Sequence, residues 1–93
     1  MKLRWSPEAA ENLSEISQYL ELHHPTYAES TVRELFDAIS SLEQMPYRGR
    51  PGKTPFTREL VFPRLPYIAV YAIKDDIVQV VSIRHTSRKP IIH

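Results

Sequence analysis

The sequence contains no cysteine and only two glycines among its 93 residues. The missing cysteine excludes a disulfide framework, a thiolate nucleophile and any cysteine-ligated zinc or iron–sulfur site. The two glycines, Gly49 and Gly52, precede a predicted strand, whereas a phosphate-cradling loop needs several glycines ahead of a helix. Nucleotide binding by a glycine-rich loop is therefore excluded as well.

Long apolar runs are also missing. The run Tyr67–Ile73 is far shorter than the roughly 20 residues of a membrane span. The basic residues near Met1 have no apolar stretch behind them that would make a secretory signal. We therefore expect a soluble, cytoplasmic protein that makes no membrane contact. A chain of this length fits one compact domain, so residues 1–93 are expected to form a single domain.

Residue patterns that would hold a metal or carry out catalysis are scarce. His23 and His24 are neighbours near a helix end, about 100° apart around its axis, so they cannot chelate one ion from one face. Asp75 and Asp76 form an acidic pair of the kind that is common in hairpin turns. No serine-centred nucleophile motif occurs. We expect neither a metal nor a cofactor.

The sequence instead shows a marked segregation of charge. Between Glu8 and Glu43 there are eight acidic residues against one base, a net charge of −7. Between Arg48 and His93 there are nine lysines and arginines against three acids, a net charge of +6. Glutamate-rich surface helices are common, but a basic half also indicates a surface that binds a polyanion or an acidic peptide.

Two helices are predicted in the acidic half. Ser6 can cap a helix that begins at Pro7, and an apolar stripe at three- and four-residue spacing then continues to near His24. A second helix begins at Pro25 and ends before Pro46. Because only two or three residues join them, the helices are expected to form an antiparallel hairpin with one shared apolar side.

Strands are predicted in the basic half, where the apolar period changes. The predicted strands are Thr57–Phe62, Tyr67–Ile73 and Ile77–Arg84, with Lys2–Trp5 as a further edge strand. The expected fold class is α+β, in the order β-α-α-β-β-β. The N-terminal helical hairpin packs on one face of a small twisted antiparallel sheet, and the other face of the sheet is partly open.

The bases of the second half form a candidate binding constellation. Guanidinium groups suit phosphates and carboxylates because they stay charged and can bind bidentately. His85 is the one imidazole of this group and the candidate for proton transfer in RNA cleavage, although for His85 alone we favour the simpler interpretation that it ends a strand and faces solvent. The residues of the constellation are Arg48, Arg50, Lys53, Arg58, Arg64, Arg84, His85, Arg88 and Lys89.

Five short motifs follow one another in a specific order and spacing. They are Ser6-Pro7-Glu8-Ala9, Gly49-Arg50-Pro51-Gly52, Thr57-Arg58-Glu59-Leu60, Pro66-Tyr67-Ile68-Ala69-Val70-Tyr71 and Ile83-Arg84-His85-Thr86-Ser87-Arg88. In this order, the chain from Leu3 to about Arg88 resembles the ParE/RelE superfamily of toxins from bacterial type II toxin–antitoxin modules. The resemblance implies the α+β fold above and a basic surface that an antitoxin occupies until the antitoxin is degraded.

The superfamily divides by target. ParE-like members poison DNA gyrase, whereas RelE-like members cut messenger RNA in the ribosome. RelE-like catalytic sets typically have several lysines before the Arg58 position, or a glutamate with a terminal His-Tyr pair. Here Lys53 is isolated and Thr86 follows His85, so the chain is closer to ParE. We therefore expect a toxin that poisons gyrase through Arg48, Arg50, Lys53, Arg58, Arg84, His85, Arg88 and Lys89.

Two alternatives stay open. In a ribosome-dependent ribonuclease, Arg58 and Arg84 would stabilise the phosphate and His85 would protonate the leaving oxygen. Lys53 or Glu59 would be the base, although strand alternation puts Glu59 on the opposite face from Arg58. A third possibility is a non-toxic module that only binds an antitoxin.

The resemblance also implies a protein partner. We expect an acidic, partly disordered segment of a cognate antitoxin to fold across the hairpin and the sheet, giving a toxin–antitoxin hetero-oligomer. The residues expected to contact it are Leu13, Ile16, Leu20, Tyr67 and Tyr71.

Overall fold

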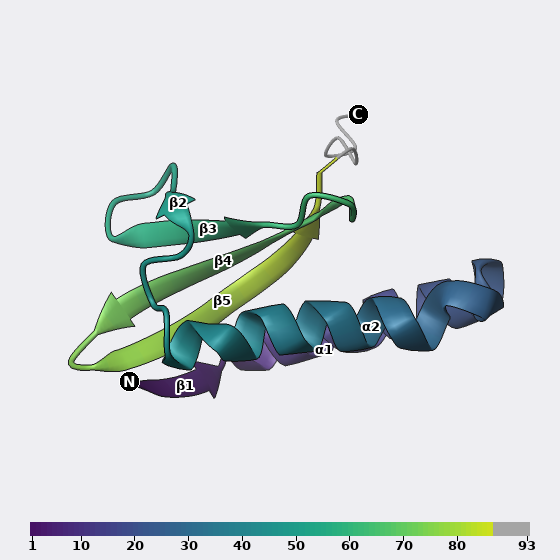
Figure 1. The fold of residues 1–93 in the computed structure, drawn as a ribbon, viewed down its shortest axis with the longest axis horizontal. Coiled ribbons are helices and arrows are strands. Elements are labelled where there is room, and N and C mark those ends of the chain that lie inside the picture. Colours follow the sequence, from purple (N-terminus) through teal and green to yellow (C-terminus); the bar gives the residue numbers. More distant parts are fainter. Residues whose placement is uncertain (87–93) are drawn as a thin grey trace.

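The computed structural model describes residues 1–86 and confirms the predicted α+β fold (Figure 1). Both predicted helices and all four predicted strands are present. In chain order the elements are β1 (Lys2–Trp5), α1 (Pro7–His23), α2 (Pro25–Ser40), the 3₁₀ turn η1 (Ser41–Glu43), β2 (Arg50–Pro51), β3 (Thr57–Val61), β4 (Tyr67–Lys74) and β5 (Ile77–His85).

The helical hairpin begins and turns at the residues that the sequence indicates. The Ser6 hydroxyl accepts the Ala9 amide at 2.9 Å, which caps α1, and donates to the Val81 carbonyl of β5 at 2.8 Å. His24 alone separates the two helices, and its amide donates to the Leu20 carbonyl. Pro25 then occupies the first turn of α2, where a missing N–H costs nothing. The two helices lie side by side beneath the sheet (Figure 1).

The sheet differs from the predicted one in two details. Its order is β1-β5-β4-β3-β2, and β1 pairs with β5 in parallel whereas all other pairs are antiparallel. Parallel strands need a long crossover connection, and the helical hairpin and three strands between β1 and β5 provide one. The second detail is a fifth strand, since Arg50 and Pro51 pair with Glu59 and Arg58 in a segment predicted as loop. A proline is tolerated there because β2 is an edge strand.

The core lies between the helices and one face of the sheet. The fully buried side chains include Leu35 and Ile39 of α2, Tyr71 of β4, and Val78 and Val80 of β5. Apolar residues therefore alternate inward on β4 and β5, as expected for strands with one covered face. Within residues 1–86, no helix is both long enough and apolar enough to cross a membrane.

The β4–β5 hairpin carries two local features that shape the sheet. Asp75 and Asp76 both have positive φ, at 53° and 62°, which is the backbone of a tight hairpin turn. The register shifts between Val70 and Tyr71, leaving Val81 as an extra residue in β5. Beyond this bulge the outer edge of β5 has no strand partner within residues 1–86, since β1 pairs only with Ile77–Val80.

Candidate functional site

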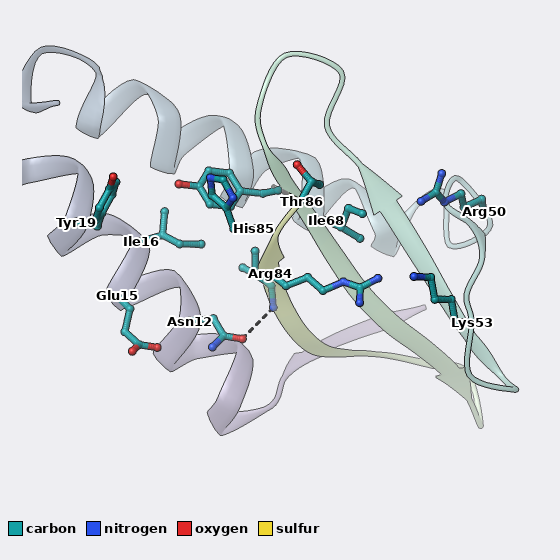
Figure 2. Close-up of a pocket in the computed structure, with 12 residues that line it drawn as sticks. Asn12, Glu15, Ile16, Tyr19, Arg50, Lys53, Ile68, Arg84, His85 and Thr86 are labelled. Atoms are coloured by element: carbon teal, nitrogen blue, oxygen red, sulfur yellow. Dashed lines mark hydrogen bonds between the residues drawn. The ribbon is translucent and has the colours of Figure 1, made fainter. Parts of the chain in front are cut away.

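A cavity of about 750 Å³ lies beside the C-terminal half of β5, between this strand and α1 (Figure 2). Arg84 extends from β5 toward Lys53 and Arg50, while Glu15 and Tyr19 line the opposite wall on α1. The cavity therefore has a cationic end and an end with one carboxylate and one aromatic ring. Its full lining is Asn12, Glu15, Ile16, Tyr19, Arg50, Lys53, Tyr67, Ile68, Ile83, Arg84, His85 and Thr86.

Two of the cavity arginines are paired with one buried carboxylate. Arg50 donates from Nε at 3.1 Å and from Nη2 at 3.0 Å to Oε1 of Glu59, and Arg84 donates from Nη2 to Oε2 at 2.9 Å. Glu59 is 4% exposed, and within residues 1–86 it is the one charged residue that is buried. A buried carboxylate is costly unless it is paired and hydrogen-bonded, which these two guanidinium groups provide. We call Arg50, Glu59 and Arg84 the arginine–glutamate triad.

Strand register places this triad on the open face of the sheet. Glu59 pairs with Arg50 on β2 and with Val70 on β4, so the side chains of Arg50, Glu59 and Val70 lie on the same face of the sheet. Arg84, opposite Ile68, faces the same way and reaches Glu59 across β4. The prediction that Glu59 and Arg58 point to opposite faces is therefore confirmed.

Arg58 belongs to the other face and is engaged in holding a loop. It lies opposite Tyr71, and its Nη2 donates to the carbonyls of Tyr47 and Gly49. Its guanidinium carbon is 5.4 Å from the centre of the Tyr47 ring. Its Nε is buried and has no hydrogen-bond partner among the described residues. Arg58 is thus a structural clamp on the segment before β2.

His85 lies at the cavity but on the covered face of the strand. It is half-buried and packs edge-on against Tyr67, with the ring centres 5.3 Å apart. The structure therefore brings Arg84 and His85 to one cavity and leaves Arg58 out of it. The three residues predicted for a ribonuclease site do not converge on a common point.

The remaining predicted target-binding residues are divided as well. Arg50 and Lys53 line the cavity, whereas Arg48 donates from Nη1 to the Ser41 hydroxyl at 2.9 Å and lies beside α2. Arg88 and Lys89 lie outside the described residues. The predicted basic residues are thus not gathered on one surface. One group of them, Arg50, Lys53, Arg84 and His85, lines the cavity.

The residues predicted to contact a partner differ in accessibility. Leu13 and Ile16 are half-buried, and Leu20 and Tyr67 are buried at 8% and 5% exposure. Tyr71 has no exposed surface, because it faces the core from a central strand and lies beneath the loop at Gly49. The Tyr71 side chain is therefore not accessible to a partner docked on this structure.

Three cavity residues on α1 were not predicted as site residues from the sequence. Asn12 accepts the Ile83 amide at 2.9 Å and so satisfies a backbone donor on the free edge of β5 (Figure 2). Glu15 and Tyr19 follow on the same side of α1 at three- and four-residue spacing. Their helical spacing, next to the apolar stripe of α1, is the sequence feature that could have predicted that they face the sheet edge. Within residues 1–86 no group of three or more histidines and acids could hold a metal ion.

Comparison with known proteins gives a consistent result. Residues 3–90 match the family model of the ParE toxin of the type II toxin–antitoxin system parDE. The chain is 35% identical over 88 residues to the protein Y4kP of Sinorhizobium fredii, covering 95% of this chain and 91% of that protein. It is 32% identical over 84 residues to the toxin RelE2 of Caulobacter vibrioides, covering 90% of this chain and 93% of that protein.

Solved structures agree with these relatives. A structure of the chromosomal ParDE toxin–antitoxin system from P. aeruginosa matches with a TM-score of 0.86 and 27% identity, over 94% of this chain and 97% of that chain. The isolated E. coli RelE toxin shares the fold, with a TM-score of 0.69 and 14% identity, over 95% of this chain and 86% of that chain.

The fold and the matched relatives define a small α+β toxin domain of the ParE/RelE superfamily. The chain belongs to the ParE toxin family of type II toxin–antitoxin systems. Its partner class is accordingly an antitoxin.

Proposed function

We propose that this toxin arrests bacterial growth from the cytoplasm by poisoning DNA gyrase, and that a cognate antitoxin neutralises it in a hetero-oligomeric complex. Membership of the ParE family supports this proposal, because the resemblance implies gyrase as the target of ParE-like members. The antitoxin-free toxin would hold gyrase in its cleaved-DNA state without hydrolytic chemistry of its own.

The observation that carries the choice of target is the separation of Arg58 from Arg84 and His85. Cleavage of RNA needs a base, an acid and a phosphate stabiliser arranged around one phosphate. Arg58 instead clamps the carbonyls of Tyr47 and Gly49 on the covered face. Glu59 is held by Arg50 and Arg84. Arg58 is therefore absent from the cavity that Arg84 and His85 line, and Glu59 is engaged with the two arginines, which favours gyrase over messenger RNA as the target.

The cavity supplies the surface proposed to meet the target. Arg50, Lys53, Arg84 and His85 line it together, and the arginine side chains are 59% and 47% exposed. Exposed basic groups on a rigid sheet are suited to recognising an acidic surface. Arg48 and the residues Arg88 and Lys89 remain proposed contributors from outside the cavity.

The helical hairpin supplies the surface proposed for the antitoxin. Leu13 lies in a groove between the helices with Val32 and Phe36, and Ile16 lines the cavity on the sheet side. Leu22 and Phe36 are 78% and 48% exposed, so the hairpin leaves apolar surface uncovered. An amphipathic antitoxin segment could cover this groove.

Adding the purified, antitoxin-free protein to gyrase, plasmid DNA and ATP tests the proposal directly. We expect linear cleaved DNA to accumulate with the wild type, less with Arg84→Gln, and wild-type amounts with Arg4→Gln. Arg4 is an exposed base on β1 that does not line the cavity, and it serves as the matched control. Circular dichroism would show that all three proteins are folded.

Two other results would overturn the proposal. If folded protein left gyrase unaffected but cut messenger RNA on ribosomes, and His85→Ala abolished this, the ribonuclease hypothesis would replace it. If expression of the folded protein caused no growth arrest at all, the chain would be a non-toxic antitoxin-binding module.

A further inference from the structure

Most of the N–H donors of Arg50 and Arg84 are not used in hydrogen bonds to Glu59. Each guanidinium group has five N–H donors in a planar fork. Arg50 directs two nitrogens to Glu59 and Arg84 directs one. Both arginine side chains are about half exposed and line the cavity, whereas Glu59 lies beneath them and does not line it. Two guanidinium groups are thus fixed in place with further donors facing the cavity.

We propose that Glu59 is a positioning residue, which holds Arg50 and Arg84 together as a site for one carboxylate of an acidic peptide segment. This inference rests on the proposed neutralisation by a cognate antitoxin: an acidic antitoxin segment bound to Arg50 and Arg84 would occupy the surface that is proposed to meet gyrase. Glu59 does not touch the ligand. It acts through the two arginines.

The charge balance of the cavity favours a single carboxylate. Without Glu59, two guanidinium groups that approach one another would repel and separate. Glu59 cancels one of their two charges, so the triad retains a net charge of +1, and Lys53 adds another beside it. With Glu15 at the far end of the cavity counted as well, three cations and two carboxylates leave a net charge of +1, which a monoanion matches. At the far end, Glu15 opposes the approach of a second negative group.

The rest of the lining favours a peptide over a nucleic acid. Ile16, Ile68 and Ile83 line the same cavity as the arginines, so an aliphatic side chain next to the carboxylate would also be buried. A nucleic-acid backbone instead requires a continuous basic track. Here the bases occupy one end and Glu15 the other (Figure 2).

The mode of binding follows from the edge of β5. Asn12 already occupies the Ile83 amide, so a partner strand cannot pair there without displacing Asn12. Recognition in this cavity therefore proceeds through side chains: one carboxylate on the two arginines and one aliphatic group on the isoleucines.

Nuclear magnetic resonance of the full-length protein, labelled with ¹⁵N, tests the proposal. The probes are two acetylated, amidated peptides, Leu-Glu-Ile-Glu-Leu and its glutamine counterpart Leu-Gln-Ile-Gln-Leu. We expect the glutamate peptide to shift the Nε–Hε signals of Arg50 and Arg84 saturably. The glutamine peptide should bind about tenfold or more weakly, because a charge-assisted bond is lost.

Variants then separate positioning from simple stability. Glu59→Gln should weaken binding of the glutamate peptide by about tenfold and broaden the Nε–Hε signals of both arginines, because their fixed arrangement is lost. Arg84→Lys keeps the charge, lacks the planar fork and should weaken binding comparably. Arg4→Gln should bind like the wild type, because Arg4 is exposed on β1 and does not line the cavity. If Glu59→Gln fails to fold, Arg84→Lys still decides whether the fork is required.

Three outcomes would overturn the inference. The peptides could bind equally, Glu59→Gln could bind like the wild type, or a single-stranded 12-nucleotide oligomer could shift the arginine signals at lower concentration than the peptide. If the wild type poisons gyrase but ignores the glutamate peptide, this inference alone fails. If the peptide binds and neither gyrase nor growth is affected, the proposed function fails and the carboxylate site stands.

Discussion

The hydroxyl of Tyr71 accepts the amide of Gly49 at 2.9 Å, across 22 residues of sequence. The same hydroxyl donates to the Pro46 carbonyl at 2.7 Å, so one side chain of β4 satisfies two backbone groups of the loop after η1. A Cβ on Gly49 would lie 2.7 Å from this hydroxyl and from the Glu59 carbonyl. This close approach explains why glycine occupies position 49, directly before Arg50, the first residue of β2.

Removing that hydroxyl is expected to destabilise the fold. Tyr71→Phe leaves the buried Gly49 amide and the Pro46 carbonyl without their partner, which should cost about 1–3 kcal/mol of unfolding free energy. Urea unfolding followed by circular dichroism would measure the change. Tyr47→Phe is the matched control, because Tyr47 is 64% exposed and Phe retains its ring beneath Arg58. Equal stability of the two variants would contradict the expected result.

Arg58 is expected to act on stability rather than directly on the target. Arg58→Gln removes the bonds to Tyr47 and Gly49 and the contact with the Tyr47 ring, at a cost of about 1–2 kcal/mol. Gyrase poisoning per folded molecule should stay close to that of the wild type. Unfolding curves and the plasmid assay, run on the same samples, measure both quantities. Normal stability together with lost poisoning would place Arg58 in the target contact instead.

Ser6 joins the start of α1 to the bulge in β5, and a substitution series can separate its two bonds. Ser6→Thr keeps both the cap on Ala9 and the bond to the Val81 carbonyl, whereas Ser6→Asp keeps only the cap. Ser6→Ala loses both, which should cost about 1–3 kcal/mol. Melting temperatures should fall in the order threonine, aspartate, alanine. An aspartate variant as stable as threonine would show that the bond to Val81 contributes little.

Asn12 protects the edge of β5 beyond the reach of β1. In Asn12→Ala the Ile83 amide loses its acceptor, so we expect its hydrogen exchange to accelerate by about tenfold and stability to fall by about 1 kcal/mol. Asn12→Asp retains an acceptor oxygen and should protect the amide. Exchange followed residue by residue gives the result. The idea is wrong if Ile83 exchanges at the same rate in the wild type and the alanine variant.

The order of secondary structure was determined largely by local features of the sequence. Ser6 and Pro7 set the start of α1, Pro25 sets the start of α2, and the apolar period changes at the strands. These signals depend on the backbone preferences of single residues and on spacings of a few positions, so they can be read without a structure. The motif order likewise identified the superfamily that the family match confirms.

Only the tertiary structure decided how the basic residues are grouped. Strand alternation showed that Arg58 and Glu59 face opposite ways, but not which face the helices cover. Once the helices cover the Arg58 face, Arg58 becomes a loop clamp and Glu59 meets Arg50 and Arg84 on the open side. The physical reason is that residues far apart in the chain come together through strand pairing and helix packing, which no local pattern of the sequence records.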